Sequence, residues 1–206
     1  MKRIIKDQEP EFWTKFKRKN PKIEYAGLAT ARDGNQIRTR MRNHLVTRQK
    51  SICCYCCRAL DMEKTNAIHI EHVKPRDQFP ALSMEYSNLL ASCSSDASCD
   101  KAKGKQYDST LFVSPLDEDC ESLFEYLTDG SIKGRNERAE WTIKTLNLNE
   151  PNLKQARKTL YEDCCLMAEA FGREYVRREY LEEKEGRLPR FVDMVEYFYD
   201  KHHFDF

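Results

Sequence analysis

Apolar residues recur at helical spacing in the first fifty residues of the chain. The segment 9–20 predicts a short helix, and Pro21 ends it because proline breaks a helix interior. Residues 35–50 predict a longer helix. Its apolar stripe repeats every four residues, at Ile37, Met41 and Leu45. Two amphipathic helices are therefore expected before the first cysteine.

The middle of the chain predicts strands. Residues 51–60 form a tight turn that is dense in cysteine. The stretch Asn66–Val73 alternates apolar and polar positions as a half-buried strand does, and Pro75 ends it. After a loop over residues 76–84, the run Tyr86–Cys93 predicts the start of a buried segment.

The C-terminal hundred residues predict helices and one hairpin. Apolar segments flank the Asp-Gly pair at 129–130, and this pair is favoured in hairpin turns. A long helical pattern runs from 151 to about 185, with Asn149 as a candidate N-cap and Gly172 as a candidate break. A last helix is expected to start at Pro189. Its apolar face consists of Phe191, Met194, Val195 and Phe198.

Composition indicates a folded domain. The chain has 206 residues, of which 40% are hydrophobic and 33% charged, so it can bury a core. It has no run of eighteen apolar residues, which excludes a membrane-spanning helix. The first residues lack the apolar core of a signal peptide, so we expect a cytoplasmic protein without membrane contact.

Charge is distributed unevenly along the chain, although the formal net charge is only +1. Residues 1–50 carry 14 basic and 5 acidic side chains, net +9, whereas residues 111–206 carry 14 and 21, net −7. A basic N-terminal quarter is typical of a surface that faces a polyanion; the alternative is a set of solvated helix faces. In the predicted second helix, Arg38 and Arg42 recur on one face, and Arg48 and Lys50 lie near the C-terminal end.

The chain has nine cysteines, an odd number that argues against a disulfide framework in a reducing compartment. Six lie between positions 53 and 99, with the spacing of a structural zinc site. In the first couple, either Cys53 with Cys56 or Cys54 with Cys57 has the C-x-x-C spacing. The second, looser couple consists of Cys93 and Cys99. Two couples that flank one short segment favour zinc over the alternative, which is a group of buried free thiols.

The sequence His-Ile-Glu-His at 69–72 offers chemistry of another kind. On a strand, His69 and Glu71 face one way and His72 the other. A carboxylate holds a hard divalent cation, and an imidazole with a pKa near ~6.5 can take a proton from water at neutral pH. Alone, such a pair is more typical of a polar strand at the surface.

Together these features resemble one family. The order C-x-Y-C, I-E-H-V-x-P, Y-x-N-L-L-x-x-C and C-D-x-x-K is similar to that of HNH endonucleases. The finer resemblance is to the HNH nuclease subunit of Septu anti-phage defence systems (PtuB-like), which also occurs beside retrons. It covers most of the chain, including the stretches RNHLVTRQKSICCYC and LNLNEPNLKQAR.

The resemblance implies a role for each matching residue. His72 would be the general base that activates water, and Glu71 would be a metal ligand. Asn88 would order the loop and orient the histidine. The implied zinc ligands are Cys53, Cys56, Cys93 and Cys99.

The third motif position departs from the family pattern. Asp100 stands there, three residues before Lys103, where the family has His or Asn. Aspartate remains an oxygen ligand suited to Mg²⁺ or Mn²⁺. The insertion between the cysteines leaves Asp96 as the alternative. His69 would either line the catalytic metal site, which we favour, or pack against the sheet.

The family implies an α+β, mostly helical fold. A ββα-metal core with a zinc knuckle would cover residues 51–106, between basic N-terminal helices over 1–50 and a mostly helical region over 107–206. The implied activity is one-metal hydrolysis of a phosphodiester bond, with Zn²⁺ as a structural ion and Mg²⁺ or Mn²⁺ at the catalytic site. An ATPase subunit of the same defence system is the implied partner.

The expected substrate is nucleic acid, with DNA preferred. The residues expected to contact it are Arg38, Arg42, Arg48, Lys50, Lys74 and Lys103. The competing hypotheses are a zinc-stabilised nucleic-acid-binding module and an adaptor with a decayed HNH site. A thiol redox protein is disfavoured, because the βαβ context of such proteins is missing.

Overall fold

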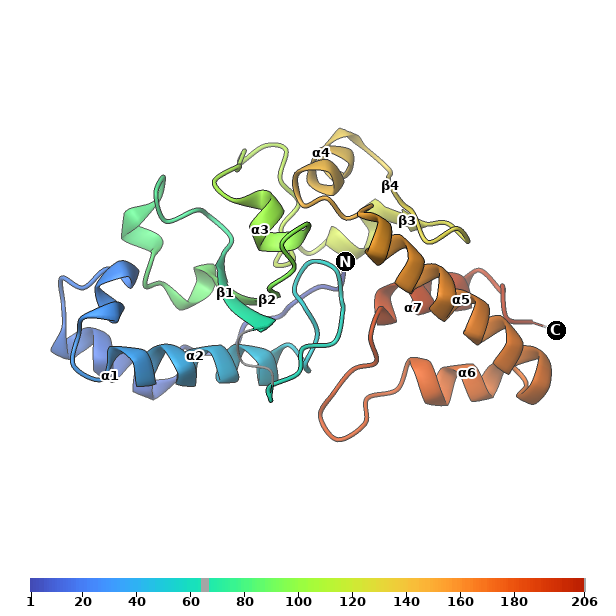
Figure 1. Cartoon of the computed structure of the whole chain (residues 1–206), viewed down its shortest axis with the longest axis horizontal. Helices are drawn as coiled ribbons and strands as arrows, with labels where there is room; N and C mark the ends of the chain where they lie inside the picture. Colours follow the sequence, from blue (N-terminus) through green and yellow to red (C-terminus); the bar gives the residue numbers. More distant parts are fainter. Residues whose placement is uncertain (64–66, 206) are drawn as a thin grey trace.

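The computed structural model describes residues 1–63 and 67–205. Within them the chain is an α+β protein dominated by helices, as the sequence predicts (Figure 1). The helices are α1 (Glu11–Lys19), α2 (Gly34–Arg48), α3 (Cys99–Lys103), α4 (Glu137–Thr145), α5 (Pro151–Phe171), α6 (Arg173–Tyr180) and α7 (Val192–Asp200). The strands are β1 (Ile68–His72), β2 (Leu89–Cys93), β3 (Phe124–Tyr126) and β4 (Ile132–Gly134).

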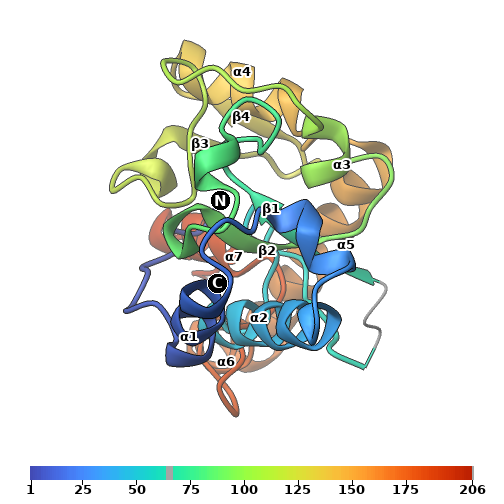
Figure 2. The same ribbon diagram turned by 90° about the vertical axis from the view of Figure 1, so that its left-hand side faces the viewer.

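An antiparallel sheet of β1 and β2 lies near the centre of the molecule. Helix α2 packs beneath it and α1 packs beside α2, which Figures 1 and 2 show from two directions. The register pairs Ile68 with Cys93 and His72 with Leu89. The loop 73–88 therefore leaves the sheet at His72, while α3 follows the opposite end of β2.

The predicted strand Asn66–Val73 corresponds to β1, although Asn66 lies outside the described residues. The predicted buried run Tyr86–Cys93 contains β2, whose five residues are all buried. The predicted strand and the predicted buried segment are both confirmed.

Two polar side chains fasten the N-terminal helices to this sheet and its loop. The indole nitrogen of Trp13, which is buried in α1, donates a hydrogen bond to the Met84 carbonyl oxygen (2.8 Å). The Gln49 amide just after α2 donates to the Ala91 carbonyl (2.8 Å) and accepts from the Ala91 amide (2.7 Å). A buried glutamine thus completes the hydrogen bonding of β2 on the side away from β1.

The C-terminal half confirms the hairpin and the helix break. Strands β3 and β4 pair around the Asp-Gly turn, and Gly172 separates α5 from α6 with φ 82°. The long helical pattern ends at Tyr180 and the last helix begins at Val192, later than the expected Pro189.

The expected N-cap of the long helix is wrong. Glu150 caps α5, because its carboxylate accepts a hydrogen bond from the Leu153 amide (3.0 Å). Asn149 instead holds β4, accepting from the Ile132 amide (2.8 Å) and donating to the Ile132 carbonyl (2.9 Å). An amide can serve both backbone groups of a strand residue, whereas a carboxylate only accepts, which suits a helix N-terminus.

Part of the charge asymmetry is neutralised inside the molecule. Lys2 pairs with Glu196 (2.6 Å), and Lys50 pairs with Glu183 (2.6 Å). These ion pairs join the basic N-terminal segment to the acidic C-terminal half. None of the helices in the described part of the chain is both long and apolar enough to cross a bilayer.

Candidate metal centre and adjoining cavity

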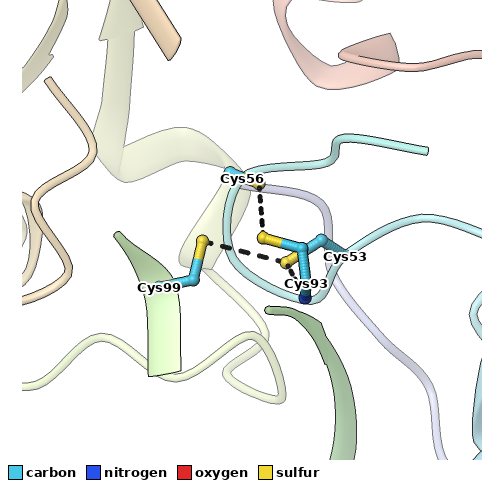
Figure 3. Close-up of side chains that lie close together, drawn as sticks. All are labelled: Cys53, Cys56, Cys93 and Cys99. Atoms are coloured by element: carbon cyan, nitrogen blue, oxygen red, sulfur yellow. Dashed lines mark hydrogen bonds between the residues drawn. The ribbon is translucent and has the colours of Figure 1, made fainter. Parts of the chain in front are cut away.

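Four cysteines from three elements converge beside the central sheet (Figure 3). Cys53 and Cys56 lie in the turn after α2, Cys93 ends β2, and Cys99 begins α3. All four are buried, and their sulfur atoms lie within 4.8 Å of one another. Among the described residues, no other group of three or more His, Cys, Asp and Glu side chains gathers its ligand atoms in this way.

The spacing of the sulfur atoms suits a tetrahedral zinc ion. The Cys53 and Cys99 sulfurs are 3.9 Å apart, and those of Cys56 and Cys93 are 3.8 Å apart. Four Zn–S bonds of about 2.3 Å in a tetrahedron place the sulfurs about 3.8 Å apart. The four residues therefore fit a structural Zn²⁺.

The environment of Cys53 also favours a thiolate, the form that binds zinc. The Cys93 amide donates a hydrogen bond to the Cys53 sulfur (3.3 Å). Burial opposes ionisation, but hydrogen bonds from neighbouring thiols outweigh it and hold the pKa of Cys53 well below its ordinary value.

The alternative first couple, Cys54 with Cys57, is not part of the cluster. Cys57 packs against Ile52 and Val192, away from the four sulfurs, and burial raises its pKa well above the ordinary value. Burial likewise raises the pKa of Cys54. Of the two possible first couples, Cys53 with Cys56 therefore joins Cys93 and Cys99, and Cys54 with Cys57 does not.

Glu71 lies next to the cysteine turn and is only 7% exposed. Its Oε1 atom accepts a hydrogen bond from the Tyr55 hydroxyl (2.7 Å) and forms an ion pair with the ammonium group of Lys103. Burial raises the pKa of Glu71, and Lys103 opposes that effect. The carboxylate therefore ties the cysteine turn, β1 and α3 together through one oxygen.

His72 is held by the loop that follows β1. Its Nε2 lies 3.0 Å from the Ser83 carbonyl oxygen, and a carbonyl only accepts, so Nε2 carries the proton and Nδ1 has the free lone pair. The ring of Tyr25 meets the imidazole edge to face, with 4.6 Å between centroids. Burial lowers the pKa of His72 to about 4, so the ring is neutral at pH 7 and can accept a proton.

Asn88 fastens both ends of that loop. Its side chain accepts from the Lys74 amide (2.8 Å) and donates to the carbonyls of Lys74 (3.0 Å) and Leu82 (3.2 Å). Leu82 precedes Ser83, whose carbonyl holds His72. Asn88 therefore positions His72 through the loop, and it lines neither of the cavities described below.

Asp100 faces Glu71 and His72 from α3. Its Oδ2 lies 2.9 Å from His69 Nδ1, and its Oδ1 lies 3.4 Å from the Ser92 hydroxyl. The side chain of Asp96, in contrast, is 96% exposed on the preceding loop. Asp100 lines the cavity described next, and Asp96 does not.

Two neighbouring cavities open beside these groups. The first has a volume of about 230 Å³ and the second about 400 Å³. Glu71 and His72 line the first, Arg38, Arg42 and His69 line the second, and Tyr25, Arg76 and Asp100 line both. Two arginines of α2 thus lie beside the carboxylates and the histidine.

Two residues that line both cavities, Tyr25 and Arg76, were not predicted from the sequence. The Arg76 guanidinium lies 5.3 Å from the centre of the Tyr25 ring, and the Tyr25 amide lies 3.4 Å from the Ser83 hydroxyl. Arg76 directly follows the His-Val-Lys-Pro stretch, which could have marked it. Tyr25 carries no local signal, because it reaches the cavity from a turn about fifty residues away in sequence.

Several cations expected at the substrate do not line these cavities. Lys103 is 1% exposed, is paired with Glu71 and lines neither cavity, and its expected phosphate contact stays a prediction. Arg48 pairs with Asp7 (3.0 Å), and Lys50 pairs with Glu183. Lys74 is exposed and lies 5.8 Å from the Phe79 ring centre, so its expected role stays a prediction.

Comparison with known proteins gives three curated relatives, while no family model matches the chain. The chain is 33% identical over 144 residues to "Retron Vc95 putative HNH endonuclease" of Vibrio cholerae. This alignment covers 65% of this chain and 69% of that protein. It is 30% identical over 150 residues to "Retron Ec83 putative HNH endonuclease" of Escherichia coli, covering 71% of this chain and 53% of the relative.

The third relative is "Septu protein PtuB" of Bacillus thuringiensis. The identity is 28% over 128 residues, which cover 58% of this chain and 48% of that protein. The alignments therefore span about half the length of the second and third relatives.

Proposed function

The chain belongs to the family of HNH endonucleases of retron and Septu systems, and on that premise we propose that it is a metal-dependent nuclease of anti-phage defence that hydrolyses phosphodiester bonds of DNA. One observation carries the proposal. Glu71, His72 and Asp100 share a cavity whose rim continues into the arginines of α2. An ATPase subunit is the partner that we propose for it in such a system.

We place the nuclease core in residues 51–106, where β1, β2 and α3 would form the ββα-metal arrangement. In this core His72 acts as the general base. Its Nδ1 atom has the free lone pair and takes the proton from the attacking water, while the Ser83 carbonyl holds the ring in one tautomer. The low pKa of His72 keeps the imidazole unprotonated before the reaction.

Glu71 and Asp100 are the proposed ligands of the catalytic cation, with His69 beside them. The two carboxylates come from different elements and line one cavity, and Asp100 adds to the effect of burial in raising the pKa of Glu71. This like-charge repulsion and the oxygen donor set suit Mg²⁺ or Mn²⁺. When bound, such a cation would neutralise charge on the scissile phosphate and the leaving oxygen.

The cysteine cluster has a structural role in this proposal. Four protein ligands leave a zinc ion no open position for water or substrate. The cluster joins the turn that carries Tyr55, the end of β2 and the start of α3. It thereby fixes the positions of Glu71 and Asp100 relative to each other in the cavity.

The function is tested by incubating the purified protein with plasmid DNA and Mg²⁺ or Mn²⁺, with and without a co-expressed ATPase. We expect nicking or linearisation in at least one of these conditions, and its loss on omission of the divalent cation. An intact plasmid in all of them, with both subunits folded and associated, would refute nuclease activity on DNA.

A second candidate is a zinc-stabilised nucleic-acid-binding or adaptor protein with a decayed site. The Lys103 ammonium already neutralises Glu71 at Oε1, which favours a structural carboxylate. This candidate predicts that the protein binds DNA without cutting it under every metal condition of the plasmid experiment.

Replacing Arg38 and Arg42 by alanine is expected to flatten the salt dependence of DNA binding. Each duplex phosphate that is neutralised contributes about −0.9 to the log–log slope, so the double variant should lose up to about two units. Fluorescence anisotropy against salt concentration measures this slope. The effect should be equal for different sequences, since phosphate contacts do not distinguish bases.

The matched control removes two charges from the other end of the same helix region. In Arg48→Ala/Lys50→Ala, both lost cations are paired with acids of this chain, so the slope should stay near that of the parent protein. If the parent protein and both double variants have equal salt slopes, Arg38 and Arg42 do not belong to the nucleic-acid surface.

A further inference from the structure

A separate concave surface lies between the two N-terminal helices. The α1–α2 groove has a cavity volume of about 630 Å³. We define it by six of its lining residues, Phe12, Phe16, Lys19, Arg32, Ile37 and Arg40. None of these six lines the cavities at Glu71 and His72.

The groove carries cations that have no ion-pair partner among the described residues. Within residues 1–63 and 67–205, Lys19, Arg32 and Arg40 form no ion pair, and all three are exposed. The only acid among the lining residues is Asp33. Unpaired cations that converge on one concavity attract a polyanion far more strongly than scattered ones.

The lining also includes aromatic and aliphatic side chains. The Arg40 guanidinium carbon lies 4.2 Å from the centre of the Phe12 ring, a cation–π contact that we call the platform of the groove. Phe16 and Ile37 line the same cavity. A cationic groove with such platforms suits single-stranded nucleic acid, whose exposed bases stack on aromatic rings and guanidinium planes. A duplex or an acidic peptide would leave the platform unused.

The groove and the proposed active site use different faces of α2. At about 100° per residue, Arg40 points about 200° around the helix from Arg38, while Arg42 returns to the face of Arg38. The cavity assignments agree, because Arg38 and Arg42 line the cavity with Asp100 and Arg40 lines the groove. One strand held in the groove would therefore contact the protein away from the scissile phosphate.

We propose that the α1–α2 groove is a second binding site, specific for single-stranded nucleic acid, that holds a segment of the substrate apart from the cut. Its role in positioning a substrate rests on the proposed nuclease function, whereas the binding itself does not. Phosphates meet Lys19 and Arg32, and a base stacks on the platform of Arg40 and Phe12.

The test measures fluorescence anisotropy of a labelled oligothymidylate of about 20 nucleotides, without added divalent cation. Lys19→Ala/Arg32→Ala/Arg40→Ala should weaken binding by about tenfold or more and reduce the salt slope by about 1.4 units, since each of the two phosphate contacts contributes about 0.7. Arg40→Lys keeps the positive charge but loses the planar guanidinium. It should therefore leave the salt slope unchanged and weaken oligonucleotide binding about fivefold.

The matched control is Lys133→Ala/Lys144→Ala/Arg190→Ala, which removes three exposed cations that also lack ion pairs among the described residues. It should bind the oligonucleotide as the parent does. Equal weakening in both triple variants, or none in the groove variant, would overturn the site. Two results would overturn the single-strand assignment. One is that polyglutamate displaces the labelled oligonucleotide as effectively as unlabelled oligonucleotide does. The other is that duplex binding is weakened by the triple substitution as much as single-strand binding is.

Hydrolysis of bis(para-nitrophenyl) phosphate in Mn²⁺ separates this inference from the proposed function. The small diester reaches the active site without the groove, so the groove variant should hydrolyse it at the parent rate. If the parent protein hydrolyses neither this diester nor plasmid DNA, the nuclease proposal fails while oligonucleotide binding still decides the groove. An unchanged thermal midpoint shows that each variant is folded.

Discussion

The Cys53→Ser protein is expected to lose its bound zinc and with it the stable folded state. Cys53 is fully buried, and its sulfur stands among three others at the junction of the cysteine turn, β2 and α3. In structural zinc sites the free energy of metal binding, about 10 kcal/mol or more, is coupled to folding.

Elemental analysis and thermal unfolding measure this effect. The parent protein should contain one zinc per chain, and Cys53→Ser should contain far less and precipitate or unfold at a much lower temperature. Cys165→Ser is the control, because that half-buried cysteine of α5 lies outside the cluster. Freshly purified parent protein without zinc, or a Cys53→Ser variant as stable as the parent, would contradict the assignment.

The second large effect is expected at His72. Replacing it by alanine should reduce DNA cleavage by about 10² to 10⁴-fold, the contribution of a well-placed general base. The fold should survive, because the substitution removes one hydrogen bond to the Ser83 carbonyl and one ring contact with Tyr25. DNA binding should also persist, since the arginines beside the cavity are unchanged.

Single-turnover cleavage of a labelled DNA and zinc content of the same sample decide this prediction. His203→Ala is the matched control, since it removes an exposed imidazole at the far end of the chain. We expect it to cut at the parent rate. Near-normal cleavage by a folded, zinc-loaded His72→Ala protein would remove His72 from the mechanism.

Much of the fold could be predicted because its signals are local. Apolar spacing predicts α1 and α2, the Asp-Gly pair predicts the hairpin, and Gly172 predicts the break that its positive φ produces. Each signal acts among residues only a few positions apart. The N-cap of α5 was predicted wrongly, because two adjacent residues suit that role and only the contact with Ile132 distinguishes them.

The cysteine spacing predicted two couples but left two choices for the first. Only the packed chain selects Cys53 and Cys56, because Cys57 is turned towards Ile52 and Val192. The motif likewise left Asp96 and Asp100 open, and the structure places only Asp100 at the cavity.

By itself the sequence determined the family, the cysteine couples and the Glu-His pair, since these depend on residue types at short spacing. The tertiary structure alone decided which charges remain available to a ligand. Lys103 and Lys50 form ion pairs with Glu71 and Glu183, whereas Lys19 and Arg32 form no ion pair among the described residues. The reason is physical: Coulomb attraction and desolvation depend on distance and burial in space, and neither is encoded by separation along the chain.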